Sequence, residues 1–513
     1  MQNEGEAKVT ERVYDFLLRP AAEEPEGVAL EFMGKSFTYH QLAERARQLA
    51  SGLAAHEVPA AASVALMLPN VPQFAEALYG AWMNGNVVVP MNVLLTAPEV
   101  RYVLDDANIR VLFVLDVFLE RVEAALAGLE NPPRVVVIGQ PGRHTPYAAL
   151  LEAAPRALEA LYPIEPDTHV LTIYTSGTTG KPKGAVIDNA NVVAQLEMID
   201  SGFEPMPGDR ALCVLPLFHV FALNAILNSG LRHRYTVVLH PKFDVAATLK
   251  SLETEGITIF CGVPTMYFYL LKFATPETRF PKLRYCVSGG SGMPPRVLHA
   301  FEERFGAPIY EGYGLTETTV SVASNTVWAK KVGSVGRLYP GVEAKIVDNE
   351  GHELPRGERG EIMIRGPNVM RRYLNRAAET LEALSGGWLH TGDIGYLDDE
   401  DYLFVVDRKR DLIIKGGYNI YPREIEDVIQ QLPQVAEAAV VGIDDEAKGE
   451  HVRACISVRP GAKLTQDELE RFLAANLAKY KLPNEYVFMN ELPKGASGKI
   501  LKRELRGVPN RSN

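Results

Sequence analysis

The chain has 513 residues, 47% of them hydrophobic and 23% charged, and this composition excludes a disordered chain or a collagen-like repeat. It carries 53 Lys and Arg against 64 Asp and Glu, so the net charge is −11 and we expect no nucleic-acid partner. The length allows roughly three domains' worth of chain.

The cysteines and the apolar stretches predict a cytoplasmic protein without a transmembrane segment. The N-terminal stretch is polar and acidic, and no apolar stretch reaches the roughly 18 residues that a spanning helix needs. We expect buried free thiols in a reducing compartment, because no C-x-x-C pair occurs. We leave open whether two copies of the chain form a homodimer. The 4 cysteines are Cys213, Cys261, Cys286 and Cys455.

The first part of the chain alternates between strand-like and helix-like segments. Residues 38–41, Thr-Tyr-His-Gln, are typical of a capping box that begins a helix. The alternation predicts a parallel sheet covered by helices. The expected strands lie at 64–68, 87–89 and 111–114, and the expected further helices at 73–83 and 98–106.

The same alternation returns later and predicts a second α/β unit. There is no fixed-period repeat, which excludes a solenoid. The expected strands lie at 213–215, 237–239, 257–261 and 285–287, and the expected helices at 221–232, 245–255 and 265–273.

After residue 340 the pattern changes to short β-like runs separated by turns, at 343–347, 361–364 and 402–406. Beyond the charged run 407–411 we expect a small α+β domain, with helices at 422–431 and 465–477 and strands at 435–443 and 452–458. The prediction is an α/β fold. Residues 1–409 form a large domain of two helix-covered sheets plus a small β unit, and residues 410–513 form the C-terminal domain.

Residues 174–184, YTSGTTGKPKG, have the composition of a loop that binds polyphosphate. Glycines permit backbone conformations in which successive N–H groups point into one concavity. A Walker A loop would need a glycine where Pro182 stands, so this is another kind of phosphate loop. Hydroxyl donors and positive charge come from Thr175, Ser176, Thr178, Thr179, Lys181 and Lys183.

This loop resembles the phosphate loop of adenylate-forming enzymes, which include acyl-CoA synthetases, luciferases and the adenylation domains of peptide synthetases. The family's other motifs follow in order and extend the resemblance to residue 499. They are LPLFH at 215–219, YGLTE at 313–317, TGD at 391–393, DR at 407–408 with KGGYN at 415–419, and PKGASGK at 493–499.

The resemblance implies ATP, Mg²⁺ and CoA as cofactors. It assigns Mg²⁺ to Glu317 and the hydroxyl of Thr175, and it places Thr316 at the α-phosphate. A single carboxylate suits Mg²⁺, which usually keeps few protein ligands beside substrate phosphates. The implied nucleotide-binding residues are Thr175, Ser176, Gly177, Thr178, Thr179, Gly180, Lys181, Lys183, Gly289, Gly290, Glu311, Gly312, Tyr313, Asp393 and Arg408.

The adenosine half of this set has a chemical rationale. A carboxylate such as Asp393 can accept hydrogen bonds from both ribose hydroxyls, with Arg408 beside it. Tyr313 offers a flat face for adenine. The turn at 288–290, which holds Gly289 and Gly290, allows close backbone approach from the other side.

Lys499 is the implied catalytic lysine, together with Thr316 and Glu317. In the family this lysine bridges the substrate carboxylate and the α-phosphate. Two anions must approach each other, and a positioned cation offsets their repulsion most strongly in the transition state. Lys499 and the phosphate loop lie in different domains, so the site is complete only when the domains close.

The resemblance also implies a mobile C-terminal domain. The domain would rotate about the hinge residue Arg410 after adenylation and remove Lys499 from the site. Lys415, Gly416 and Gly417 would then line a tunnel for the thiol of CoA.

Phe218 and His219 are expected to border the acyl pocket. His219 is not expected to act as a general base, because a carboxylic acid is already ionised at pH 7. The segment after His219 and residues 262–267 resemble bacterial medium- and long-chain fatty acyl-CoA synthetases.

We therefore predict that the acid is fatty and that each buried CH₂ of its chain contributes ~0.8 kcal/mol. The reaction would be acyl-adenylate formation with release of pyrophosphate, followed by transfer to CoA. Aryl acids such as cinnamates remain an alternative, because ring pockets use similar apolar residues. An amine or a carrier-protein thiol remains an alternative acceptor.

Sequence features argue against two other functions. A kinase-like enzyme would release ADP, and the missing Walker lysine spacing argues against it. A binding protein without activity would have lost Lys499, Glu317 or Asp393, and all three are present. The 11 histidines form no H-E-x-x-H motif and no Cys/His cluster, so a zinc enzyme is not indicated.

Overall fold

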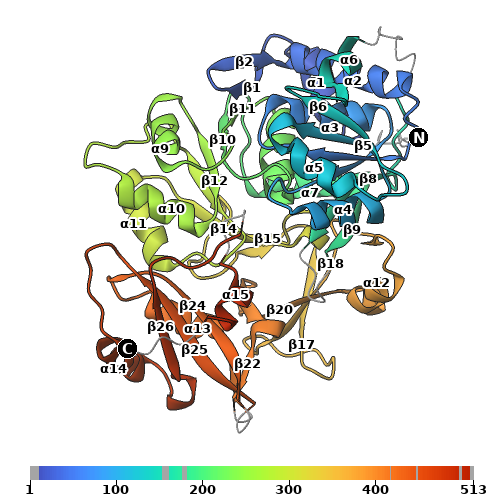
Figure 1. The fold of residues 1–513 in the computed structure, drawn as a ribbon. Helices are drawn as coiled ribbons and strands as arrows, with labels where there is room; N and C mark the ends of the chain where they lie inside the picture. The colour runs from blue at the N-terminus through green and yellow to red at the C-terminus, as the bar shows by residue number, and fades with distance from the viewer. Residues whose placement is uncertain are drawn as a thin grey trace, which may run out of the picture.

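The computed structural model describes residues 11–152, 161–175, 182–415, 418–445, 449–495 and 500–508. Two large sheets and a small β unit occupy the chain up to residue 408, and an α+β unit follows, drawn in orange-red in Figure 1. The predicted α/β fold class is confirmed.

The first large sheet has eight strands in the order β19-β9-β8-β4-β3-β5-β6-β7. The strands from β8 to β7 are parallel, and β9 and β19 extend one edge in antiparallel fashion. The strands are β3 (Ser63–Met67), β4 (Val87–Pro90), β5 (Ile109–Leu115), β6 (Arg134–Ile138), β7 (Thr145–Pro146), β8 (His169–Thr175), β9 (Lys183–Asp188) and β19 (Arg372–Tyr373). The associated helices are α2 (Tyr39–Ala55), α3 (Pro72–Met83), α4 (Ala97–Asp106), α5 (Leu119–Leu126), α6 (Tyr147–Glu152) and α7 (Asn189–Gly202).

The second large sheet has nine strands in the order β16-β15-β14-β13-β12-β10-β11-β1-β2. The strands from β14 to β1 are parallel to one another, and β2 at one edge and β15 and β16 at the other are antiparallel. The strands are β1 (Val28–Phe32), β2 (Lys35–Thr38), β10 (Arg210–Cys213), β11 (Thr236–Leu239), β12 (Ile259–Gly262), β13 (Tyr285–Ser288), β14 (Ile309–Tyr313), β15 (Ala323–Ser324) and β16 (Arg337–Leu338). The helices are α1 (Asp15–Glu23), the π-helix η2 (Phe221–Asn228), α8 (Ser229–Arg232), α9 (Val245–Thr254), α10 (Pro264–Phe273) and α11 (Pro295–Phe305).

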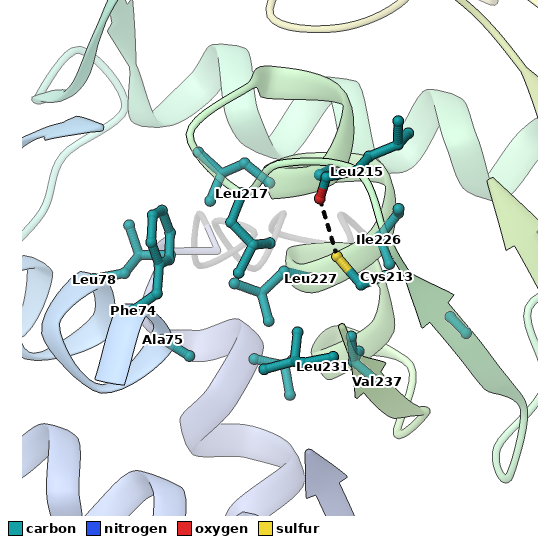
Figure 2. Packing of buried hydrophobic residues seen from close by; sticks show 14 of the residues in the cluster. Phe74, Ala75, Leu78, Cys213, Leu215, Leu217, Ile226, Leu227, Leu231 and Val237 are labelled. Carbon is teal, nitrogen blue, oxygen red and sulfur yellow. Dashed lines mark hydrogen bonds between the residues drawn. The ribbon is translucent and has the colours of Figure 1, made fainter. Parts of the chain in front are cut away.

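The two sheets share one hydrophobic core. Helices α4 and α5 cover one face of the eight-stranded sheet, and α2, α3 and η2 lie in the core on its other face. Figure 2 shows Phe74 and Leu78 of α3 packed toward Leu227 of η2 and Leu231 of α8. These side chains are fully buried, so the two α/β units form one packed body.

The capping signal at Thr38 predicted the start of α2 correctly, whereas the segment at 221–232 differs from the helix that was predicted there. The capping box is present, because the Thr38 hydroxyl accepts from the backbone N–H of Gln41 at 3.2 Å and the Thr38 N–H donates to the Gln41 side chain at 3.0 Å. Residues 221–232 were expected to form one regular helix, but eight of them form a π-helix. Two buried asparagines explain the difference, since Asn228 donates to Asn224 at 2.8 Å and Asn224 donates to the Thr319 carbonyl at 3.1 Å.

The small β unit and the C-terminal unit complete the chain. The small unit is an antiparallel sheet of β17 (Glu343–Val347), β18 (Gly360–Arg365), β20 (Leu389–Leu397) and β21 (Leu403–Arg408), with α12 (Ala377–Ala383) nearby. The C-terminal sheet contains β22 (Ile413–Lys415), β23 (Tyr418–Ile420), β24 (Val435–Asp445), β25 (Gly449–Val458) and β26 (Glu485–Met489). Its helices are α13 (Pro422–Ile429), α14 (Gln466–Asn476) and α15 (Lys502–Arg506). The described residues after 412 form their own hydrophobic clusters, and the domain boundary at residues 409 and 410 stays a prediction.

All four cysteines are buried and free, as expected from their apolar surroundings. Among the described helices, none combines the length and the apolar character needed to cross a bilayer.

Candidate active site

Glu317 lies in a short 3₁₀ turn that follows β14, and its carboxylate is held by a residue that the motifs did not indicate. The hydroxyl of Tyr373 in β19 donates to Glu317 Oε1 at 2.7 Å. Lys183, the first residue of β9, lies with its ammonium 5.2 Å from the centre of the same tyrosine ring. Tyr373 therefore brings the predicted metal carboxylate and the end of the phosphate loop to one place. Thr316 lies in the same turn.

Asp393, Tyr313 and Arg408 form the second cluster. Asp393 of β20 and Arg408 of β21 are paired across the small sheet, and Arg408 Nε lies 3.2 Å from Asp393 Oδ1. The Tyr313 hydroxyl donates to Asp393 Oδ2 at 2.6 Å. Burial and the adjacent carboxylate raise the pKa of Tyr313 well above its usual value, so the hydroxyl keeps its proton and acts as a donor. The predicted ribose and adenine residues are thus in direct contact.

Glu311 and the turn at 288–290 lie beside this cluster. Ser288 of β13 is in register with Glu311 of β14, and its hydroxyl is buried without a hydrogen-bond partner among the described residues. The Glu311 carboxylate accepts from the backbone N–H of Met293 at 2.9 Å. Burial raises the pKa of Glu311 to about 7, an effect that the nearby Arg423 of α13 opposes. The Glu311 carboxyl group therefore contacts the backbone at Met293, three residues after the turn.

Two of the predicted glycines leave little space for a side chain. A Cβ added at Gly289 would lie 3.2 Å from the Phe221 ring, and one added at Gly312 would lie 3.2 Å from the Ser324 hydroxyl. Gly290 has φ +84°, which disfavours other residues. Glycine is therefore favoured at these positions by their protein neighbours and by the backbone conformation, and the contact of this turn with adenine stays a prediction.

Phe218 and His219 lie at the entry to η2 and are partly exposed. His219 Nδ1 accepts from the Phe221 N–H at 3.3 Å. Of the eight residues of η2, only Phe221 and Ala225 are partly exposed, and both are apolar. The partly exposed residues of η2 therefore carry no charge.

The phosphate loop is described only at its two ends. Thr175 ends β8 and is paired with Lys183 of β9. Ser176, Gly177, Thr178, Thr179, Gly180 and Lys181 lie outside the described residues. On one side, the hydroxyl of Tyr174 donates to Asp106 of α4 at 2.7 Å, and on the other, Tyr102 of α4 donates to the Pro182 carbonyl at 2.8 Å. Helix α4 thus holds both ends of the loop.

The predicted residues of the C-terminal unit are described in part. Lys499, Gly416 and Gly417 lie outside the described residues, as does the side chain of Arg410. Lys494 and Ile500, which flank the lysine segment, form a β-bridge, and Lys494 Nζ lies 3.4 Å from the Tyr269 hydroxyl of α10. Lys415 donates to the Leu482 carbonyl at 3.3 Å within its own unit, and β22 lies at the end of that unit away from the large sheets (Figure 1).

Two family models match the chain along most of its length. Residues 17–374 match the AMP-binding enzyme model, and residues 424–499 match the AMP-binding enzyme C-terminal domain. The chain belongs to the AMP-binding enzyme family. The chain is an AMP-forming acid–CoA ligase, and ATP, Mg²⁺ and CoA are its cofactors. The kinase-like alternative is therefore excluded.

Relatives of this family are similar over nearly their whole length. The chain is 35% identical to a long-chain-fatty-acid–CoA ligase of Bacillus subtilis, covering 94% of this chain and 92% of the relative. It is 37% identical to an indoleacetate–CoA ligase of Aromatoleum aromaticum, covering 96% and 97%. Among solved structures, ATP-bound MatB from Rhodopseudomonas palustris superposes with a TM-score of 0.90 at 30% identity, covering 96% of this chain and 98% of that one.

The residues around Glu317 fit the Mg²⁺ ion of an AMP-binding enzyme. Tyr373 occupies one carboxylate oxygen and leaves the other for a hard cation. Mg²⁺ is commonly held by one or two carboxylates together with substrate phosphates, so one free oxygen beside the phosphate loop is sufficient. Within the described ranges no group of three or more His, Cys, Asp or Glu could hold a metal on its own.

Proposed function

We propose that this AMP-binding enzyme activates a medium- or long-chain fatty acid. The acid's carboxylate oxygen attacks the α-phosphorus of ATP, the bond to the β-phosphate oxygen breaks, and pyrophosphate leaves. The thiol of CoA then attacks the acyl carbon, and AMP leaves with the electrons of the acyl–oxygen bond. Two easier displacements replace one difficult condensation.

We assign the nucleotide to the clusters described above. Asp393 would accept from the ribose hydroxyls with Arg408 beside it, and Tyr313 would cover the adenine. The contact between Tyr313 and Asp393 supports this assignment, because the two side chains proposed for one nucleoside are hydrogen-bonded to each other at 2.6 Å. The backbone at Gly289, Gly290, Glu311 and Gly312 would contact the opposite face of the base.

We assign the phosphates to the loop and the metal to Glu317. Residues 175–181 and Lys183 would surround the phosphates, and Thr316 would donate to the α-phosphate. Mg²⁺ bound by Glu317 and Thr175 would neutralise phosphate charge during attack. The shared contact of Glu317 and Lys183 with Tyr373 supports a single phosphate site.

We propose that the C-terminal unit, residues 410–513, delivers Lys499 in the first step and Lys415, Gly416 and Gly417 in the second, by rotation at Arg410. The position of Lys494 against α10 supports the first arrangement, because the flank of the lysine segment contacts the large sheets. The β22–β23 hairpin is then at the far end of the unit (Figure 1).

The apolar face of η2 carries the assignment of a fatty acid. Phe221 and Ala225, the partly exposed residues of η2, offer this acid no cation for a second carboxylate. An apolar chain gains ~0.8 kcal/mol for each buried CH₂. The relative named a long-chain-fatty-acid–CoA ligase supports the same class. An aryl acid is the second candidate, favoured by the packing of the Phe221 ring against Gly289 and by the indoleacetate relative.

The test is an exchange of labelled pyrophosphate into ATP, run with saturated acids of increasing length, cinnamates and indoleacetate. We expect exchange to rise with chain length and then level off. Exchange that is strongest with ring acids would replace the fatty-acid assignment with the aryl one. Parallel assays with CoA, a carrier protein and simple amines identify the acceptor.

We place this enzyme in the cytoplasm and in lipid metabolism. The four buried free thiols support a reducing compartment. A homodimer stays a prediction, and sedimentation of the purified chain tests it.

A further inference from the structure

A five-residue segment, residues 372–376, connects two parts of the site that belong to different sheets. Its first two residues form β19 and pair with β9 on the edge of the eight-stranded sheet. The Leu374 N–H continues this pairing by donating to the Gly184 carbonyl at 2.7 Å. The segment is therefore fixed to the strand that leaves the phosphate loop.

Tyr373 reaches from this segment to the other sheet. Its side chain is 8% exposed, and its hydroxyl is 2.7 Å from Glu317, which follows β14 of the nine-stranded sheet. The bond occupies Oε1 and fixes the direction in which Oε2 points.

Arg376 reaches back to the phosphate loop. Its guanidinium donates to the Tyr102 hydroxyl at 2.6 Å and to Asp106 Oδ1 at 2.9 Å. Tyr102 in turn donates to the Pro182 carbonyl, and Asp106 accepts from Tyr174. One guanidinium thus contacts the two α4 residues that hold the two ends of the loop.

We infer that residues 372–376, here called the brace, keep Glu317 and the phosphate loop in register, with Tyr373 and Arg376 as positioning residues. This inference rests on the proposed metal role of Glu317. A cation shared by a carboxylate and a phosphate tolerates little displacement of either group. Glu317 follows a strand of one sheet, and the phosphate loop lies between two strands of the other. A side chain fixed to one sheet and bonded to the other removes that freedom before ATP binds.

The two positioning residues have different expected signatures. Tyr373→Phe removes only the hydroxyl, so the Mg²⁺ concentration for half-maximal exchange should rise about tenfold, since a hydrogen bond to a charged group is lost. Arg376→Met frees the loop ends, so the KM for ATP should rise about tenfold while the Mg²⁺ midpoint changes less. Arg376→Lys should recover part of the loss.

Two matched controls leave the contacts of Tyr373 and Arg376 intact, one far from the brace and one at the residue that precedes it. Tyr14→Phe removes a buried hydroxyl that bonds to the Tyr162 carbonyl at 3.0 Å, and Arg371→Met removes an ion pair with Asp188 at 2.9 Å. Both should lower the unfolding temperature by an amount similar to the brace variants and leave the Mg²⁺ and ATP curves unchanged.

Calorimetric titration with α,β-methylene-ATP, with and without Mg²⁺, gives a readout that does not depend on turnover. We expect Mg²⁺ to improve binding less in Tyr373→Phe than in the unmodified chain. An equal Mg²⁺ effect in both proteins would overturn the inference, as would equal shifts in the controls and the brace variants. If the unmodified chain binds the analogue but shows no acid-dependent exchange, the proposed function fails. The effect of Mg²⁺ on analogue binding in Tyr373→Phe then still shows whether the brace positions Glu317.

Discussion

Replacing Glu311 with glutamine tests how burial affects a carboxyl group next to the candidate site. Glu311 is 3% exposed, accepts one backbone hydrogen bond from Met293, and lies near Arg423 of the C-terminal unit. Burial outweighs the cation, and the pKa rises from 4.5 to about 7. The glutamine variant keeps the shape of the side chain and has no proton to exchange.

The direction of the effect follows from proton binding. Between pH 4.5 and pH 7 the folded chain holds the Glu311 proton more tightly than the unfolded chain does. The free energy of unfolding therefore falls as the pH rises through this window and levels off above it. At about 1.4 kcal/mol per pKa unit, the loss amounts to about 3 kcal/mol.

The assay is urea unfolding at several pH values between 4.5 and 8. Trp82 is fully buried in the core shared by the two sheets, so its fluorescence reports unfolding of this part of the chain. We expect Glu311→Gln to gain about 3 kcal/mol relative to the unmodified chain between the two ends of the range. Glu343→Gln is the control, because Glu343 lies in β17 with a side chain that is 58% exposed beside Arg365.

A difference between Glu311→Gln and the unmodified chain that stays constant across this pH range would refute the reasoning. It would mean that Glu311 is ionised throughout and that Arg423 compensates for burial. A gain at low pH instead of high pH would show that the Glu311 pKa lies below its usual value.

Two further predictions concern the proposed reaction. Lys499→Ala should lower the adenylation rate by orders of magnitude and leave attack of CoA on supplied acyl-AMP largely intact, measured as separate half-reactions; equal damage to both would contradict a lysine that leaves the site after adenylation. Asp393→Asn should weaken ATP binding about 30-fold, because two hydrogen bonds to a charged acceptor become neutral at a cost of about 1 kcal/mol each, and unchanged nucleotide affinity would contradict the ribose assignment.

Local signals were sufficient where neighbouring residues determine the structure. The capping box at Thr38 predicted where α2 begins. The helical pattern at 73–83 and 98–106 predicted both ends of α3 and α4 to within one residue. The π-helix was not predictable, because Asn224 is held by the carbonyl of Thr319, 95 residues away. Nor does periodicity indicate that β1 and β2 join the second sheet. β2 pairs with β1, and β11, the other partner of β1, is about 200 residues further along the chain.

The site shows the same division. Asp393 and Glu317 were assigned by resemblance to family motifs. Arg408 and Tyr313, the partners of Asp393, were expected from the same motifs, whereas Tyr373, the partner of Glu317, was not. Tyr373 and Arg376 were missed because nothing in their local sequence marks them. Tyr373 is 56 residues from Glu317, and Arg376 is 270 residues from Asp106. Contacts between residues that are far apart in the sequence, and that belong to no recognised motif, become visible only once the fold is known.

The interface between the C-terminal unit and the rest of the chain supports the proposed rotation on energetic grounds. Its described contacts are mostly polar: Arg359 pairs with Glu424, Lys494 contacts Tyr269, and Arg423 donates to the Val405 carbonyl at 2.9 Å. Such partly exposed pairs contribute about 0–1 kcal/mol each, so exchanging them for water costs little. Glu311 differs from these pairs, because Arg423 of the C-terminal unit lowers the pKa of a carboxyl group that burial raises. Opening of the interface removes that cation, and proton uptake during opening would show that the Glu311 side chain keeps its burial when the unit moves.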